Sequence, residues 1–189
     1  MARRCFFSFD YKDVRDFRAN VVRKHNEFKE DNGGYFDASI WEEAATKGDQ
    51  ALKNLIDGSL ENTTATAVLI GTRTHERRWV HYEIMKSIKR GNRLIGVHIN
   101  GIRDTNRTTL PLGHDPFDHL ALRISADGLK GTPLVWNGTA WVDYTDVEPF
   151  TFKQRPENER GQAFKLNNWW KTYDWVSDSG FENFETWIA

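Results

Sequence analysis

Three nearly continuous apolar runs mark the first hundred residues of the chain. They cover residues 3–9, 66–70 and 93–99. Apolar runs of this length that do not alternate with polar positions are typical of strands buried on both faces of a parallel sheet. We therefore expect Phe7, Leu69 and Ile95 to lie on adjacent parallel strands.

The segments between these runs have the apolar spacing of helices. Helices are expected at about residues 12–29, around residues 52–60 and at about residues 76–90. In the first of them, the apolar stripe would consist of Val14, Phe17, Val21 and Phe28. Residues 35–38 predict a further short strand, and residues 39–49 a mobile loop in which Ser39 and Glu42 have the spacing of a capping box. Strand–helix alternation of this kind predicts an α/β fold, with a parallel sheet and helices on both faces.

The pattern changes beyond residue 100. A polar stretch from 100 to 118 predicts a long loop. The apolar segments 134–136 and 140–144 flank Asn137-Gly138, which is a strong signal for a β-hairpin turn. Eight aromatic residues follow between Phe164 and Trp187, and the last of them belong to an expected helix.

The whole chain, residues 1–189, is expected to form a single domain, because its length fits one hydrophobic core. The core of this domain would cover about residues 3–125. A C-terminal extension of about residues 126–189 would contain the β-hairpin and the aromatic-rich helix. Its aromatic side chains could pack against the core or form a surface for a partner.

Composition and charge exclude several classes of protein. With 26 Lys and Arg against 27 Asp and Glu, the formal net charge is −1, so nucleic acid is not an expected partner. No apolar run approaches the roughly 20 residues that a membrane helix needs, so we expect no membrane association. Asp10 interrupts the N-terminal apolar run too early for a signal peptide, and Cys5 is the single cysteine. We therefore expect a cytoplasmic protein without intrachain disulfides.

Common catalytic motifs are missing from the sequence. It contains no Gly-rich loop of the P-loop type, no Gly-x-Gly-x-x-Gly after the first strand and no Gly-x-Ser-x-Gly nucleophile turn. His75, His81 and His98 lack the spacing of zinc ligands, and one cysteine cannot form a thiolate cluster. No metal site and no bound cofactor are predicted.

The candidate chemistry lies in the helix expected at about residues 76–90. At about 100° per residue, Val80, Ile84 and Ile88 form its core-facing ridge. Glu83 falls at the boundary of that ridge, where its side chain can reach a cleft beside the sheet. The alternative is a solvated pair between Glu83 and Lys86, worth a few tenths of a kcal/mol. In either case, the replacement Glu83→Gln is expected to change stability little.

A family resemblance rests on two stretches and on their order. They are Trp79-Val80-His81-Tyr82-Glu83-Ile84 and Arg93-Leu94-Ile95-Gly96-Val97. They resemble the third helix and the fourth strand of TIR domains that cleave NAD, in which a tryptophan precedes the catalytic glutamate by four residues. The first strand, followed by Asp13, also resembles the opening of TIR domains. The chain is still more similar to the TIR-like proteins of the Thoeris antiphage system, and this similarity extends into residues 173–176 and 184–187.

The resemblance implies a flavodoxin-like, TIR-like fold and an enzyme that cleaves NAD at the nicotinamide–ribose bond. It also implies a cyclic ADP-ribose-type product that acts as a signal in antiphage defence. NAD is then the substrate and not a cofactor, and Glu83 has the position of the catalytic residue. Expelling neutral nicotinamide from a cationic pyridinium needs no general acid. A single carboxylate that stabilises an oxocarbenium-like ribose can therefore suffice.

The resemblance also implies which residues border the substrate: Ser8, Phe9, Asp10, Tyr11, Trp41 and Trp79. Asp10 departs from many TIR hydrolases, which carry a basic residue at this position, so recognition of the pyrophosphate is expected to differ. The basic residues between 73 and 93 could hold the pyrophosphate or form a solvated helix face. Trp41 lies in the segment that moves and mediates assembly in TIR domains.

Partners follow from the same resemblance. It implies a phage-derived trigger, without which the protein is nearly silent, and a separate effector protein that the small-molecule product activates. A homo-oligomer is a further expectation, of a size that the sequence does not give. The alternative is a non-catalytic TIR-like module that binds a nucleotide or a protein. The combination of Trp79 with Glu83 favours the enzyme.

Overall fold

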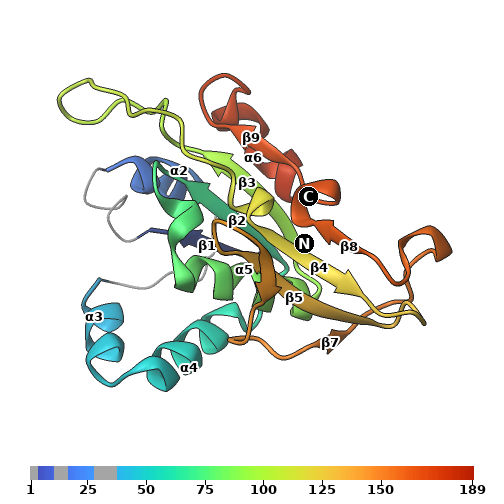
Figure 1. Cartoon of the computed structure of the whole chain (residues 1–189). Helices are drawn as coiled ribbons and strands as arrows, with labels where there is room; N and C mark the ends of the chain where they lie inside the picture. The colour runs from blue at the N-terminus through green and yellow to red at the C-terminus, as the bar shows by residue number, and fades with distance from the viewer. Residues whose placement is uncertain (1–3, 11–16, 28–37) are drawn as a thin grey trace.

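The computed structural model describes residues 4–10, 17–27 and 38–189, and its centre is a parallel sheet. The described strands of this sheet lie in the order β1 (Cys5–Phe9), β2 (Ala65–Ile70), β3 (Arg93–His98) and β9 (Thr172–Asp174) (Figure 1). Ala67 of β2 pairs with Phe7 on one side and with Ile95 on the other. The predicted parallel arrangement of the first three apolar runs is confirmed.

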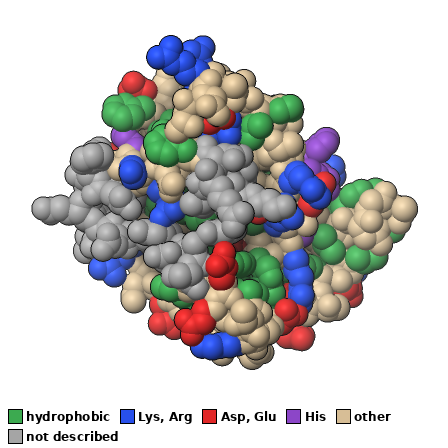
Figure 2. Space-filling view, turned by 90° about the vertical axis from the view of Figure 1, so that its left-hand side faces the viewer, with side chains coloured by type: hydrophobic (Ala, Val, Ile, Leu, Met, Phe, Trp, Pro, Cys, Tyr) green, Lys and Arg blue, Asp and Glu red, His purple; other side chains and the backbone are tan. Residues whose placement is uncertain are grey.

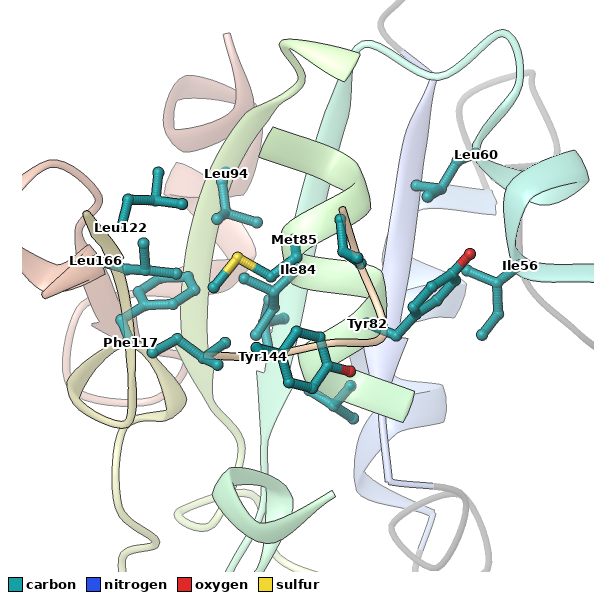
Figure 3. Close-up of a cluster of buried hydrophobic side chains, with 14 of the residues drawn as sticks. Ile56, Leu60, Tyr82, Ile84, Met85, Leu94, Phe117, Leu122, Tyr144 and Leu166 are labelled. Atoms are coloured by element: carbon teal, nitrogen blue, oxygen red, sulfur yellow. The ribbon is translucent and has the colours of Figure 1, made fainter. Parts of the chain in front are cut away.

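The side chains of β1 alternate between the two faces of this sheet, as the period of two in a strand requires. Cys5 and Phe7 belong to one core cluster, and Phe6 belongs to the other. The first cluster includes residues of α2 (Arg18–Glu27) and α6 (Gly180–Ile188). The second includes residues of α4 (Asp49–Leu60) and α5 (Arg78–Arg90), several of which Figure 3 labels. Helices therefore cover both faces, as predicted.

The start of the chain differs in part from the expectation. Val14, Phe28 and residues 35–37, where a short strand was expected, lie outside the described residues. Phe17 precedes α2 with a positive φ of 69° and is 42% exposed, so it does not belong to the buried stripe of the helix. That stripe consists of Ala19 and Val22.

The expectation of a loop at residues 39–49 is wrong. Residues Ala38–Thr46 form α3, which packs against α4. The segment is rich in Ala and Glu, which favour helix, and the capping-box spacing of Ser39 and Glu42 is itself a signal for the start of a helix. Gly48, with a φ of 94°, separates the two helices at a conformation that other residues rarely adopt.

A second, antiparallel sheet follows the first along the chain. Its strands are β4 (Leu120–Ile124), β5 (Lys130–Trp136), β6 (Trp141–Asp143), β7 (Phe150–Thr151) and β8 (Ala163–Lys165). They lie in the order β6-β5-β4-β8, and β7 also pairs with β5. Short 3-10 helices occur at η1 (Thr74–Glu76), η2 (Pro116–Asp118), η3 (Glu157–Glu159) and η4 (Leu166–Asn168). The described residues 100–115 of the loop expected at 100–118 contain no helix or strand, and its last three residues form η2.

The C-terminal extension contains both predicted features. Strands β5 and β6 form the expected hairpin, in which the Asn137 side chain accepts hydrogen bonds from the backbone of Thr139 and Ala140. Strand β9 returns to the first sheet and pairs with β3. Phe184 of α6 stacks on Phe7 of β1, with ring centroids 5.9 Å apart, so aromatic side chains of the extension pack against the core. No helix in the described part of the chain is long and apolar enough to cross a membrane.

Candidate active site

Glu83 is buried between α5 and β1. Val80 and Ile84 of the expected ridge of α5 are buried, and Ile88 is partly buried against the same core. Glu83 is itself only 4% exposed. Ser8 lies on the face of β1 that α5 covers, because it is two residues from Phe6. The Ser8 hydroxyl donates a hydrogen bond to Glu83 Oε2 over 2.5 Å. The structure thus joins two residues that are 75 positions apart in the sequence.

The environment of Glu83 disfavours its charged form. Burial raises the pKa of the Glu83 carboxyl group to about 8, and the hydrogen bond from Ser8 acts in the opposite direction. In the described part of the chain, no Lys or Arg side chain forms an ion pair with Glu83. A cationic ring that entered the neighbouring cleft would therefore favour the carboxylate.

The solvated pair considered as an alternative for Glu83 is not present. Lys86 forms an ion pair with Asp57 of α4, with Nζ and Oδ2 2.7 Å apart. Tyr82 also donates a hydrogen bond to Asp57 over 3.1 Å. Lys86 thus connects α5 with α4, while Glu83 faces the sheet.

A cleft of about 310 Å³ opens beside the carboxyl end of β1 and the first half of α5. The described residues that line it are Phe7, Phe9, Asp10, Trp41, Glu76, Arg77, Arg78, Trp79, Val80 and Glu83. They come from β1, α3, η1 and α5, so the cleft brings together segments that are distant in the sequence. Its position, beyond the end of a parallel strand, is where ligands of open α/β sheets generally bind.

Aromatic side chains form much of the cleft wall. The rings of Trp41 on α3 and Trp79 on α5 meet edge to face, with centroids 6.4 Å apart and planes at 83°. The guanidinium group of Arg78 lies 4.8 Å from the ring centroid of Trp79. Arg78 also forms ion pairs with Asp146 and Asp49, which fix it at the rim of the cleft. Flat, apolar walls of this kind suit a planar ring.

Charged groups occur at the cleft, but in pairs. Arg77 Nε donates to Asp10 Oδ2 over 2.5 Å, and the Arg77 side chain is 28% exposed. Glu76 pairs with Arg73 over 2.7 Å. Figure 2 shows Lys and Arg side chains interspersed with Asp and Glu over the visible part of its face, without a broad patch of one sign.

Five of the seven predicted site residues line the cleft: Phe9, Asp10, Trp41, Trp79 and Glu83. Ser8 does not line it but lies behind it, bonded to Glu83. Tyr11 lies outside the described residues. No group of His, Cys, Asp or Glu within the described ranges could hold a metal ion.

Sequence reasoning missed several residues of the cleft. Phe7 was assigned to the strand core alone, and Glu76, Arg77 and Arg78 were grouped with a basic helix face. Their position just before the tryptophan and glutamate of α5 is the one feature of the sequence that could have indicated that Glu76, Arg77 and Arg78 line the cleft. The polar partners that hold the two arginines, Asp10 and Asp146, are visible only in the structure.

The fold and the cleft together are those expected of a TIR-like domain. A parallel sheet is covered by helices on both faces, and a glutamate preceded by a tryptophan four residues earlier faces a cleft at the end of β1. Comparison with known proteins agrees: a family model described as "Thoeris protein ThsB, TIR-like domain" matches residues 6–104. The chain belongs to this family.

A curated protein of similar sequence is known from Bacillus cereus (strain MSX-D12). It is 47% identical to this chain over 191 residues, and the alignment covers 100% of both chains. That protein is provisionally named cyclic ADP-D-ribose synthase ThsB1.

Proposed function

We propose that this protein cleaves NAD at the nicotinamide–ribose bond and releases a cyclic ADP-ribose-type molecule. The observation that carries the proposal is the Glu83 carboxyl group, which is buried, has no ion-pair partner in the described residues and borders an aromatic cleft. The name of the Bacillus cereus relative supports the class of product.

The proposed reaction balances without a metal or a proton donor. The bond between ribose C1 and the pyridinium nitrogen breaks, and its electron pair neutralises the nitrogen, so nicotinamide leaves as a neutral base. The ribose becomes oxocarbenium-like, and the Glu83 carboxylate stabilises that positive charge in a site of low polarity. A nucleophilic atom of the same ADP-ribose then bonds to C1 and loses a proton, which closes the ring. If water reacts instead, the product is free ADP-ribose.

The walls of the cleft suit the two ends of this substrate. Phe9, Trp41 and Trp79 offer aromatic surfaces for the nicotinamide or adenine ring. Arg77 supplies a positive charge for the pyrophosphate at the same cleft. These contacts would place the ribose near Glu83, because the glutamate lines the cleft beside Trp79 and Val80.

The biological setting follows from membership of the Thoeris family. We expect the reaction in the cytosol, where a phage-derived trigger would start it and a separate effector protein would receive the product. Assembly into a homo-oligomer belongs to the same expectation. The next experiment tests the trigger, while the location, the effector protein and the assembly stay predictions.

The test is product analysis after incubation of the purified protein with NAD. Mass spectrometry would separate nicotinamide, free ADP-ribose and cyclic ADP-ribose isomers, with and without a lysate of phage-infected cells. We expect equal amounts of nicotinamide and a cyclic product in the triggered sample, and neither with Glu83→Gln. Lack of nicotinamide release under both conditions would favour the non-catalytic module.

A further inference from the structure

The carboxyl group of Glu83 has one hydrogen-bond partner within the described part of the chain, the Ser8 hydroxyl group. We propose that Ser8 is a positioning residue, which holds the Glu83 carboxylate toward the cleft and does not itself contact NAD. This inference rests on the proposed function, because it assigns Ser8 a part in the same reaction.

The placement of Ser8 separates it from the substrate. Its side chain is fully buried (0% exposed) and does not line the cleft, whereas Phe7 and Phe9 on either side of it do. The alternation of β1 directs the Ser8 side chain to the face of the sheet that α5 covers and the Phe7 side chain to the opposite face. Ser8 faces α5, and Glu83 lies between it and the cleft.

The bond restricts the carboxyl group of Glu83, for which no other hydrogen bond is found among the described residues. The helical position of Glu83 is fixed by the packing of α5 and by Ser87, whose hydroxyl donates to the Glu83 carbonyl oxygen over 2.7 Å. Neither contact determines where the carboxylate points. The bond of 2.5 Å from Ser8 holds Oε2 against the sheet, which leaves the other oxygen for a ligand.

The other charged groups at the cleft are paired elsewhere. Arg77 pairs with Asp10, and Glu76 pairs with Arg73. Arg78 pairs with Asp49 and Asp146. Ser8 is therefore the group that opposes the effect of burial on Glu83, since a hydroxyl that donates to a carboxylate favours its charged form. Removing this donor should shift the titration of Glu83 to higher pH.

Three substitutions at one position test the proposal. Ser8→Ala removes the donor, Ser8→Cys keeps a similar volume with a weak donor, and Ser8→Thr keeps the hydroxyl group. We expect Ser8→Ala and Ser8→Cys to lower kcat roughly ten- to a hundredfold, the range of a hydrogen bond to a charged group. KM should change little, the pH midpoint of kcat/KM should rise, and Ser8→Thr should restore both kcat and the midpoint.

Thr66→Val is the matched control. Thr66 is also fully buried and contributes its hydroxyl to a contact with Ser87 of α5, 2.8 Å away. Loss of this hydroxyl should lower the melting temperature without moving the pH midpoint. A raised KM with an unchanged kcat in Ser8→Ala would identify Ser8 as a substrate contact and overturn the proposal.

A second measurement does not depend on turnover. Carbon-13 NMR titration of the glutamate carboxyl groups, with Glu83→Gln to assign the Glu83 signal, gives the pKa of Glu83 directly. We expect a higher pKa in Ser8→Ala than in the unmodified protein, and equal values would overturn the positioning role. If the unmodified protein releases no nicotinamide while the titration shifts as expected, the proposed function fails and the contact between Ser8 and Glu83 stands.

Discussion

Arg77 donates a hydrogen bond to Asp10 over 2.5 Å, and this contact connects the residue after β1 with the residue before α5. The resemblance to TIR hydrolases led us to expect a changed recognition of the pyrophosphate, because Asp10 occupies a position that is basic in many of them. The structure places a basic group at the same cleft from a different segment. Arg77 is thus the candidate for the pyrophosphate contact.

Arg77→Gln should raise KM for NAD severalfold and change kcat less, because the lost charge interacts with the substrate away from the breaking bond. Arg73→Gln is the matched control, since Arg73 pairs with Glu76 but does not line the cleft. Steady-state kinetics at low and moderate salt measure the effect. Equal KM values for the two variants would mean that Arg77 does not bind the pyrophosphate.

Trp41→Ala should raise KM for NAD about tenfold, because stacking of an aromatic side chain on a base contributes roughly 1–3 kcal/mol. Trp41→Phe should retain most of the affinity. Trp136→Ala is the control, because Trp136 is 36% exposed on β5 and lies outside the cleft. If Trp41→Ala binds NAD as tightly as the unmodified protein, Trp41 serves to pack α3 and not to bind substrate.

The activity should rise with pH. Burial raises the pKa of Glu83 to about 8, and only the carboxylate can stabilise a cationic ribose. The profile of kcat/KM, which reports the free enzyme, should therefore increase up to a plateau above the pKa. The midpoint in kcat should lie lower, because bound NAD brings a cationic ring close to Glu83. Initial rates measured at pH values on both sides of this pKa show whether activity rises or falls with pH. A rate that falls with rising pH would indicate a protonated Glu83 acting as an acid.

Glu83 should also make stability depend on pH. Its pKa of about 8 in the folded protein lies above the ordinary value of 4.5, so between these values the folded state binds more protons than the unfolded state. The free energy of unfolding therefore falls as pH rises through this window. The loss is at most about 1.4 kcal/mol for each unit by which the pKa of Glu83 differs between the folded and unfolded states. Glu83→Gln should be more stable than the unmodified protein at alkaline pH, and the difference should shrink on acidification.

Urea unfolding at about pH 5 and about pH 9 measures this difference. Lys86→Gln is the control, because Lys86 pairs with Asp57 at the partly exposed contact between α5 and α4. A difference between Glu83→Gln and the unmodified protein that does not vary with pH would contradict the burial of an ionisable Glu83. From the sequence alone, Glu83→Gln was expected to leave stability nearly unchanged. Because Glu83 is buried, we expect a pH-dependent change in stability instead.

Most of the first sheet could be predicted because its strands carry their own signal. The apolar runs of β1, β2 and β3 and the ridge of α5 are local patterns, and Gly91 ends α5 in a left-handed conformation with a φ of 80°. Strand β9 has no such signal. Its three residues, Thr172–Asp174, are half-buried and form a strand only because β3 offers a free edge.

The site could be predicted only as far as spacing and resemblance reach. Trp79 and Glu83 were identified from their order in one helix. A helical projection gives the direction of each side chain around the helix axis, but it does not show which element of the fold that side chain meets. It placed Glu83 at a boundary, while Ser8 and the packing of α5 on β1 bury it. The pairs between Arg77 and Asp10 and between Trp41 and Trp79 join distant segments, so no local pattern contains them.

We propose above all that the Glu83 carboxylate performs the cleavage of NAD. The most direct measurement is nicotinamide release by Glu83→Gln, with Lys86→Gln as control, in the presence of a lysate of infected cells. We expect Glu83→Gln to remain folded and to lose a factor of roughly a hundred to a thousand in rate, as removal of one stabilising group in a transition state typically costs. Lys86→Gln should stay near the unmodified rate. An unmodified rate in a folded Glu83→Gln protein would contradict this proposal.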